Sequence, residues 1–217
     1  MDTGRKRTAG PPKSLPRELS SCIFFLILGA LLGAFSKWMD TLACGDGNLW
    51  AGLLLKLGLP RLFSKPAVWA LIALTIAVGS RSAGKAALNT FSLFLGMMAG
   101  YYAYTVLVIG FVPREAILAW GLLTLLTPAA AVIAWAAKGG GLWGTCLSGA
   151  ILAFFLSQTF YMGFWYCDLV GWAELVMTAL AGAVLFSGWK KLLWSLVPAV
   201  VLAPVIQRLL PFLVGGL

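Results

Sequence analysis

Residues 86–112 read AALNTFSLFLGMMAGYYAYTVLVIGFV, and no charged side chain interrupts them. As a helix, a stretch of this length would rise about 40 Å, more than the roughly 30 Å of a bilayer's hydrocarbon core. In lipid its backbone must satisfy its own hydrogen bonds, and the stretch lacks the apolar and polar alternation of a barrel strand. It therefore predicts a transmembrane helix.

The whole chain has the composition of an integral membrane protein. Hydrophobic residues make up 61% of the 217 residues and charged residues 11%, whereas soluble domains average about 45–50% and about 25%. Windows of roughly 20 residues predict apolar spans at 21–42, 66–80, 86–112, 116–137, 142–164, 173–188 and 192–215. Segment 66–80 is short for a span, so we predict an all-α, polytopic transmembrane helical bundle with six to seven spanning helices.

Two segments differ from these spans. Residues 1–20 are basic and rich in Gly, Pro and Ser, which predicts a disordered cytosolic tail before a single transmembrane domain, residues 21–217. Segment 44–60, between the first two spans, repeats large apolar residues at helical spacing, at Leu49, Trp50, Leu53, Leu54 and Leu57. This pattern predicts an interfacial helix, or a lid over a site.

The basic residues predict how the bundle is inserted. With the N-terminus inside, ten Lys and Arg side chains lie on the cytosolic side and five lie outside. The positive-inside rule then predicts a multi-pass protein of a cell membrane, of the bacterial inner-membrane type, with a cytosolic N-terminus and an external C-terminus. Because topology accounts for most of the formal charge of +9, we expect the lipid bilayer as a partner and no nucleic acid.

The sequence lacks the residue sets of common enzymes and metal sites. It has no histidine, and its four cysteines show no C-x-x-C spacing, which removes the commonest general base and the usual metal ligands. We expect no catalytic residues, no metal, no cofactor and no enzymatic activity. Cys44 and Cys167 both fall in predicted outer loops, where a disulfide and two free thiols are both open.

Four spans predicted to run outward become polar at one depth, about 15 or 16 residues from their inner ends. A helix rises about 22–24 Å over this length, so the polar positions lie in the outer half of the membrane. Acids from the flanking segments would surround this layer. The candidate binding residues are Lys37, Asp40, Tyr101, Tyr102, Tyr104, Gln158, Tyr161, Trp165, Asp168, Glu174, Gln207 and Arg208.

This polar layer has two interpretations. Tyr, Trp and Lys near helix ends anchor membrane proteins, so the layer could be an interfacial belt. The amides Gln158 and Gln207 gain nothing from lipid and favour a cavity, whose aromatic faces and acids would suit a small organic cation or zwitterion. The second interpretation predicts a small-solute transporter or a substrate-binding transport subunit.

Small residues at four-residue spacing occur in the first and third spans, at Gly29, Ala30, Gly33, Ala34, Gly96 and Gly100. They predict close helix packing within the bundle, or a docking face for a membrane protein partner at Gly29, Ala30, Gly33 and Ala34. The alternative function is therefore a non-transporting assembly or regulatory partner of a larger membrane complex. In size, helix count and the Ala30–Ala34 pair, the chain resembles the substrate-binding components of energy-coupling-factor transporters, which usually have six spans.

Overall fold

The structure is a computed structural model, and it describes residues 15–42, 49–56, 58–110, 114–162, 165–186 and 188–209. The longer helices are α1 (Leu15–Leu42), α4 (Pro66–Gly79), α5 (Ala83–Tyr104), α6 (Arg114–Ala137), α7 (Gly141–Thr159), α8 (Trp172–Leu185) and α9 (Trp189–Leu209). The shorter elements are α2 (Leu49–Lys56), α3 (Leu59–Phe63), the π-helical turn η1 (Thr105–Ile109), β1 (Phe160–Met162) and β2 (Cys167–Leu169). The predicted all-α helical bundle is confirmed at this level.

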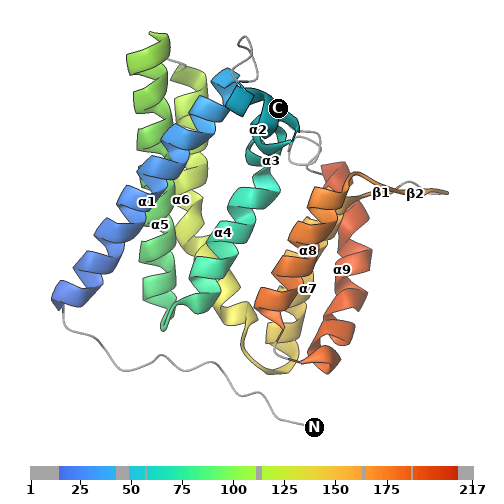
Figure 1. The fold of residues 1–217 in the computed structure, drawn as a ribbon. Coiled ribbons are helices and arrows are strands. Elements are labelled where there is room, and N and C mark those ends of the chain that lie inside the picture. The colour runs from blue at the N-terminus through green and yellow to red at the C-terminus, as the bar shows by residue number, and fades with distance from the viewer. Residues whose placement is uncertain are drawn as a thin grey trace.

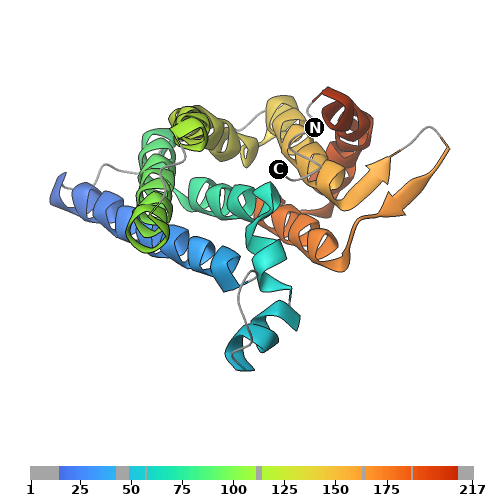
Figure 2. The same cartoon turned by 90° about the horizontal axis from the view of Figure 1, so that it is seen from above.

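Consecutive longer helices run in alternating directions (Figure 1). α1, α5, α7 and α9 therefore finish at the same end of the bundle, where β1 and β2 also lie, and we call it the hairpin end. We call the opposite end, where residues 80–82 join α4 to α5, the Arg81 end. Viewed from above, α4 lies between α1 and α5 on one side and α7, α8 and α9 on the other (Figure 2).

Five of the described helices are long and apolar enough to cross a membrane, namely α1 from Leu19, α5 with η1, α6, α7 and α9. The helices α4 and α8 have 14 residues each, which is about 21 Å of helix against a core of roughly 30 Å. The chain is thus a multi-pass membrane protein. The structure thus supports five spanning helices among the described residues, and the predicted count of six to seven is not confirmed.

Large apolar side chains cover the outside of the bundle. On α1, the side chains of Ile23, Phe24, Ile27 and Leu31 are exposed, and their spacing places them on one face of the helix. A surface of this kind suits contact with hydrocarbon, where apolar side chains lose nothing by facing outward. The surface therefore fits the predicted contact with a lipid bilayer.

The first half of the chain differs from the predicted boundaries at two places. Helix α1 begins at Leu15, so the predicted limit at residue 20 falls inside it, and residues 1–14 lie outside the described part of the chain. Segment 44–60 contains α2 and the first residues of α3 instead of a single helix. Cys44, one half of the disulfide considered above, also lies outside the described residues.

The predicted span 142–164 is too long, because α7 ends at Thr159. The chain then forms an antiparallel hairpin, in which Phe160 pairs with Leu169 and Met162 with Cys167. Each strand has three residues, too few for an alternating pattern to reveal it in the sequence. The hairpin is the one departure from helical structure that the described residues show beyond turns.

Helices α1 and α5 pack in parallel with their backbones in contact. A methyl group added at Gly29 or Gly33 would overlap the carbonyl group of Leu93 or Met97, and one at Gly100 would overlap that of Ala30. Small residues at this spacing allow such an approach. Close packing within the bundle is therefore confirmed. Because α5 covers Gly29 and Gly33, the predicted docking face for a partner protein is not free on α1.

The second half of the bundle is built on small and polar contacts between α7 and α9. Gly149 lies against the ring of Pro198, where a methyl group would overlap it. The Ser195 hydroxyl donates to the Thr145 carbonyl at 3.1 Å. At the Arg81 end, the Lys191 ammonium donates to the Ala137 carbonyl at 2.7 Å, which caps the end of α6. These contacts join α6, α7 and α9 into one unit.

Candidate functional site

A cavity of about 270 Å³ lies at the hairpin end between α1, α4, α5 and α6. We call it the aromatic cavity, because five of its lining residues carry rings. Asp40 is the one charged residue among the described residues that line it. The lining comprises Ser36, Asp40, Phe63, Ser64, Trp69, Met97, Met98, Tyr101, Tyr102, Trp120 and Thr124.

The close approach of α1 and α5 brings together three polar side chains beside this cavity, Lys37, Asp40 and Tyr101. Gly33 meets Met97, and one turn later Lys37 meets Tyr101 at the same offset of 64 residues. The Tyr101 hydroxyl donates to Asp40 Oδ2 at 3.0 Å. Because the helices are parallel and nearly touching, side chains one turn beyond the glycines must lie side by side.

Lys37 completes this group without lining the cavity. Its Nζ donates to Tyr101 Oη at 3.3 Å, lies 3.9 Å from Asp40 Oδ2 and 4.9 Å from the centre of the Tyr101 ring. The ion pair is partly exposed, and such pairs gain little from Coulomb attraction. Lys37 and Asp40 therefore form an ion pair three residues apart on α1. Asp40 remains open to the cavity.

Aromatic rings form the other walls of the cavity. Trp69 donates its indole N–H to the Phe63 carbonyl at 2.9 Å, and the two rings meet edge to face at 5.8 Å. Tyr101 and Tyr102 make a similar contact at 5.3 Å. The tyrosines are among the binding residues predicted from the sequence, whereas Phe63, Trp69 and Trp120 are not. Tryptophans near helix starts are typical of the interfacial belt, so their position alone did not distinguish a cavity wall.

A second, apolar cavity of about 630 Å³ continues from the first toward the middle of the bundle. The two cavities share Ser64, Trp69 and Trp120. Alanine, leucine and phenylalanine side chains of α4, α5, α6 and α7 form most of its wall. Thr90 also lines it and is 1% exposed, and its hydroxyl is buried with no hydrogen-bond partner among the described residues.

Gln158 lies on α7 between the apolar cavity and the hairpin end, and it is not among the residues that line either cavity. It follows Ile151 and Phe154, which line the apolar cavity, by seven and four residues, and side chains at these spacings share one helix face. Its side chain is 7% exposed, and its Nε2 has no hydrogen-bond partner among the described residues. The sequence argument that this amide avoids lipid is consistent with its burial.

Gln207 has a different role from the one predicted. Its Oε1 accepts from the Met162 N–H at 3.1 Å, and its Nε2 donates to the Ser157 carbonyl at 2.8 Å and to that of Phe160. These contacts satisfy the backbone where α7 ends and β1 begins. The amide of Gln207 thus holds the helix end and the hairpin together, and Gln207 lines neither the aromatic nor the apolar cavity.

Glu174 forms a buried ion pair with Lys65 instead of rimming the cavity. The Glu174 side chain is 5% exposed and that of Lys65 22%. The pair connects the start of α4 with the first turn of α8. Burial and, second, repulsion from Arg61 lower the pKa of Lys65, and the contacting Glu174 carboxylate opposes this shift. Lys65 stands between Ser64 and Pro66, so the pair also positions one wall of both cavities.

The remaining predicted residues lie apart from the cavities. Tyr161, Trp165 and Asp168 are exposed on the hairpin, Trp165 by 98%. Arg208 is exposed near the end of α9, and Tyr104 is partly buried one turn beyond Tyr101 without lining the aromatic cavity. The residues of the predicted layer therefore fall into separate groups. Lys37, Asp40, Tyr101 and Tyr102 form one of them, and Gln207 with the α7 terminus forms another.

Within the described ranges, no three His, Cys, Asp or Glu side chains gather as a metal site would require. The chemistry available at the site is hydrogen bonding, one carboxylate and aromatic faces. Polar groups and aromatic faces of this kind are typical of pockets that bind small molecules. No protein-family model, curated protein or solved structure matches the chain.

Proposed function

We propose that the protein binds a small organic cation or zwitterion in the aromatic cavity and acts as a small-solute transporter or as the substrate-binding subunit of one. The observation that carries this proposal is the position of Asp40 as the charged lining residue among five aromatic side chains. Aromatic faces attract cations, and the attraction reaches about 2 kcal/mol where water is excluded. A carboxylate beside them favours a positive ligand further.

Lys37 is the reason that the proposed ligands include zwitterions as well as cations. Its ammonium lies outside the lining of the aromatic cavity but 3.9 Å from Asp40 Oδ2, so a zwitterion whose cationic part meets Asp40 would place its anionic group toward Lys37. A ligand with both charges would satisfy both side chains without separating them. The same pair disfavours simple anions, which would meet the Asp40 carboxylate at the cavity wall.

The apolar cavity supports ligands that carry a hydrocarbon part. Its volume of about 630 Å³ lies within the range of about 300–1,000 Å³ typical of ligand pockets. Because it shares Ser64, Trp69 and Trp120 with the aromatic cavity, one molecule can place a charged group beside Asp40 and an apolar group below it. Each buried CH₂ contributes about 0.8 kcal/mol.

The alternative function is assembly of a larger membrane complex, and it was based on a docking face of small residues on α1. The small residues Gly29 and Gly33 contact α5 in this bundle, so their spacing is accounted for by internal packing. The exposed apolar surfaces that remain are those expected of any protein in a bilayer.

Thermal unfolding of the detergent-solubilised protein tests the proposal. Choline should raise the midpoint of unfolding, because a ligand that binds the native state stabilises it by RT ln(1 + [L]/Kd), about 2.7 kcal/mol at 100 times Kd. Its uncharged isostere 3,3-dimethylbutan-1-ol has nearly the same shape and should have a much smaller effect. Equal effects of the two compounds, or no effect of any amine or zwitterion tested, would contradict the proposal.

A chain-length series tests the apolar extension separately. Alkyltrimethylammonium ions should bind about fourfold more tightly for each added CH₂ while the chain fills the apolar cavity. Ala130→Phe places a ring in that cavity and should abolish the dependence on chain length. Ala129→Phe is the matched control, because Ala129 is exposed as Ala130 is but does not line the cavity. It also corrects for partition of the chains into detergent.

A further inference from the structure

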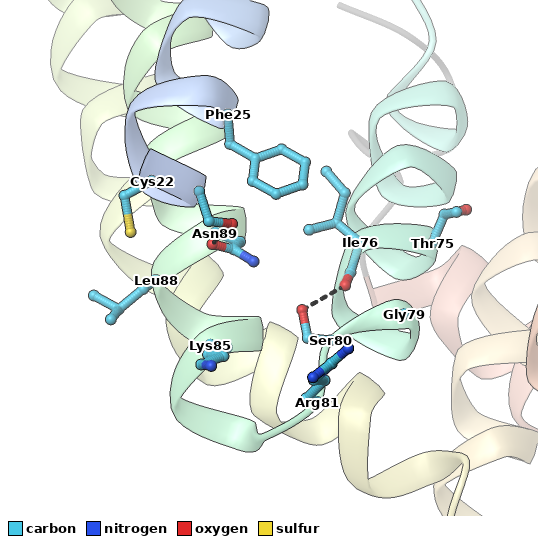
Figure 3. A pocket seen from close by; sticks show the side chains of 11 residues that line it. Cys22, Phe25, Thr75, Ile76, Gly79, Ser80, Arg81, Lys85, Leu88 and Asn89 are labelled. Carbon is cyan, nitrogen blue, oxygen red and sulfur yellow. Dashed lines mark hydrogen bonds between the residues drawn. The ribbon is translucent and has the colours of Figure 1, made fainter. Parts of the chain in front are cut away.

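A third cavity, of about 440 Å³, lies at the Arg81 end between α1, α4 and α5 (Figure 3). It is separated from the aromatic cavity by the length of α5 and shares no lining residue with it. Its polar lining residues include Ser21, Ser80, Arg81, Lys85 and Asn89. The inference drawn from it is independent of the proposed function.

The charged residues among the described lining of this cavity are both cationic. Arg81 and Lys85 are its charged lining residues, and no acid occurs among the described residues that line it. Both side chains lie at the mouth of the cavity in Figure 3. Helix α5 begins between them, with the Ser82 hydroxyl accepting from the Lys85 N–H at 3.3 Å. The positive end of the α5 dipole therefore adds to the field of the two side chains.

Asn89 provides a hydrogen-bond donor deeper in the same cavity. It lies one helical turn beyond Lys85 and is 9% exposed. Its Oδ1 accepts from the Ser21 hydroxyl at 3.1 Å, which fixes the orientation of the amide. In Figure 3 the amide nitrogen points into the gap between α5 and α4. A donor held in this way lies above two cations and can bind an oxygen of an anion.

The wall above these groups is apolar. Phe25 from α1, Ile76 from α4 and Leu88 from α5 line it, and the Phe25 ring projects into the gap between the helices (Figure 3). A cavity with cations at the mouth and hydrocarbon above matches a molecule with an anionic group at the membrane surface and an apolar part in the membrane. Basic pockets between transmembrane helices bind anionic lipid headgroups in this way.

We propose that the Arg81, Lys85 and Asn89 side chains bind the phosphate group of an anionic ligand at this end of the bundle. Positive charge near a helix end also serves topology, and two cations beside a span are common. Topology alone requires neither a shared cavity nor an oriented amide donor above the cations. Arg81 would supply a planar pair of donors and Lys85 a point charge, which together suit the oxygens of a phosphate ester.

Thermal unfolding of the full-length protein with two phosphate sources tests this site. The membrane source is dihexanoylphosphatidylglycerol, compared with dihexanoylphosphatidylcholine, and the soluble source is glycerol phosphate. Stabilisation by the anionic lipid alone identifies a lipid headgroup as the ligand. Stabilisation by glycerol phosphate as well shows that a free phosphate ester is sufficient. An absence of stabilisation by both phosphate sources would overturn the proposal.

Matched variants test whether stabilisation by a phosphate ligand comes from binding in this cavity. Arg81→Gln and Lys85→Gln should each weaken binding about fivefold, and the double variant about 25-fold. Asn89→Asp has the same size and places a negative charge beside the phosphate, so it should weaken binding at least as much as either. The control Lys138→Gln/Lys190→Gln removes two exposed cations near the same end outside the cavity. An equal loss in the control would show general attraction to basic protein and would overturn the assignment.

Discussion

The ion pair between Lys65 and Glu174 holds the start of α4 against α8. Removing the Lys65 charge should destabilise the protein more than removing the Glu174 charge. Lys65→Met leaves the Glu174 carboxylate, which is 5% exposed, without its partner. A buried charge left unpaired costs about 3–5 kcal/mol. Glu174→Gln should cost less, because the Lys65 side chain is 22% exposed and its ammonium can reach water or headgroups more easily.

The double variant Lys65→Met/Glu174→Gln measures the interaction between the two charges apart from the effect of losing either side chain. Removal of both charges leaves no unpaired ion, so the double variant should be more stable than Lys65→Met alone. The coupling between the two positions should be about 1–3 kcal/mol. Lys56→Met is the control, since Lys56 is exposed on α2 and its loss should change stability by less than about 0.5 kcal/mol.

Unfolding in mixed micelles with increasing sodium dodecyl sulfate, followed by circular dichroism, measures these differences. Ser64 and Pro66 flank Lys65 and line the cavities, so Lys65→Met should also weaken ligand binding. Equal costs for the two single variants, with a double variant at their sum, would refute the reasoning. That result would mean that the two charges are already separated by water.

Four further substitutions test packing and polar contacts. Gly100→Ala should destabilise the bundle by more than about 2 kcal/mol because its methyl group overlaps the Ala30 carbonyl, whereas Gly84→Ala, which meets no neighbour, should stabilise α5 by up to about 1 kcal/mol. Gln207→Leu should cost at least about 2 kcal/mol by leaving the backbone at the end of α7 unpaired, and cation binding should be unchanged. Gln158→Leu removes a buried amide nitrogen without a partner, so stability in the absence of ligand should be unchanged or higher. A large loss of stability in that variant, measured by the same unfolding assay, would show that the amide has a partner in the native protein.

Counting residues predicts one depth for the polar layer, but it does not predict the division of the layer into groups. A helix rises by a fixed amount per residue, so Lys37, Tyr101 and Gln158 were placed at one height from the sequence alone. Their lateral positions depend on which helices are neighbours. The glycine spacing predicted close packing, yet nothing in it indicated that α1 and α5 would be the partners.

The contacts of Gln207 could not be predicted, because they depend on where α7 ends. The predicted span 142–164 continued through residues 160–162, so the backbone groups there were assumed to be satisfied within a helix. Because α7 ends at Thr159, the carbonyl groups of Ser157 and Phe160 need other donors, and Gln207 supplies them. Trp69 and Trp120 were missed for a different reason, since an interfacial tryptophan and a cavity wall have the same sequence pattern.

Equilibrium binding of radiolabelled choline to the protein in nanodiscs tests the central claim most directly. Saturable binding should weaken at least about tenfold, or about 1.4 kcal/mol, in Asp40→Asn, which keeps an acceptor for the Tyr101 hydroxyl but removes the charge. Asp168→Asn should bind like the unmodified protein, because Asp168 is exposed on the hairpin and lies outside the aromatic cavity. Equal affinity in Asp40→Asn and the unmodified protein would contradict the claim that this carboxylate recognises the cation.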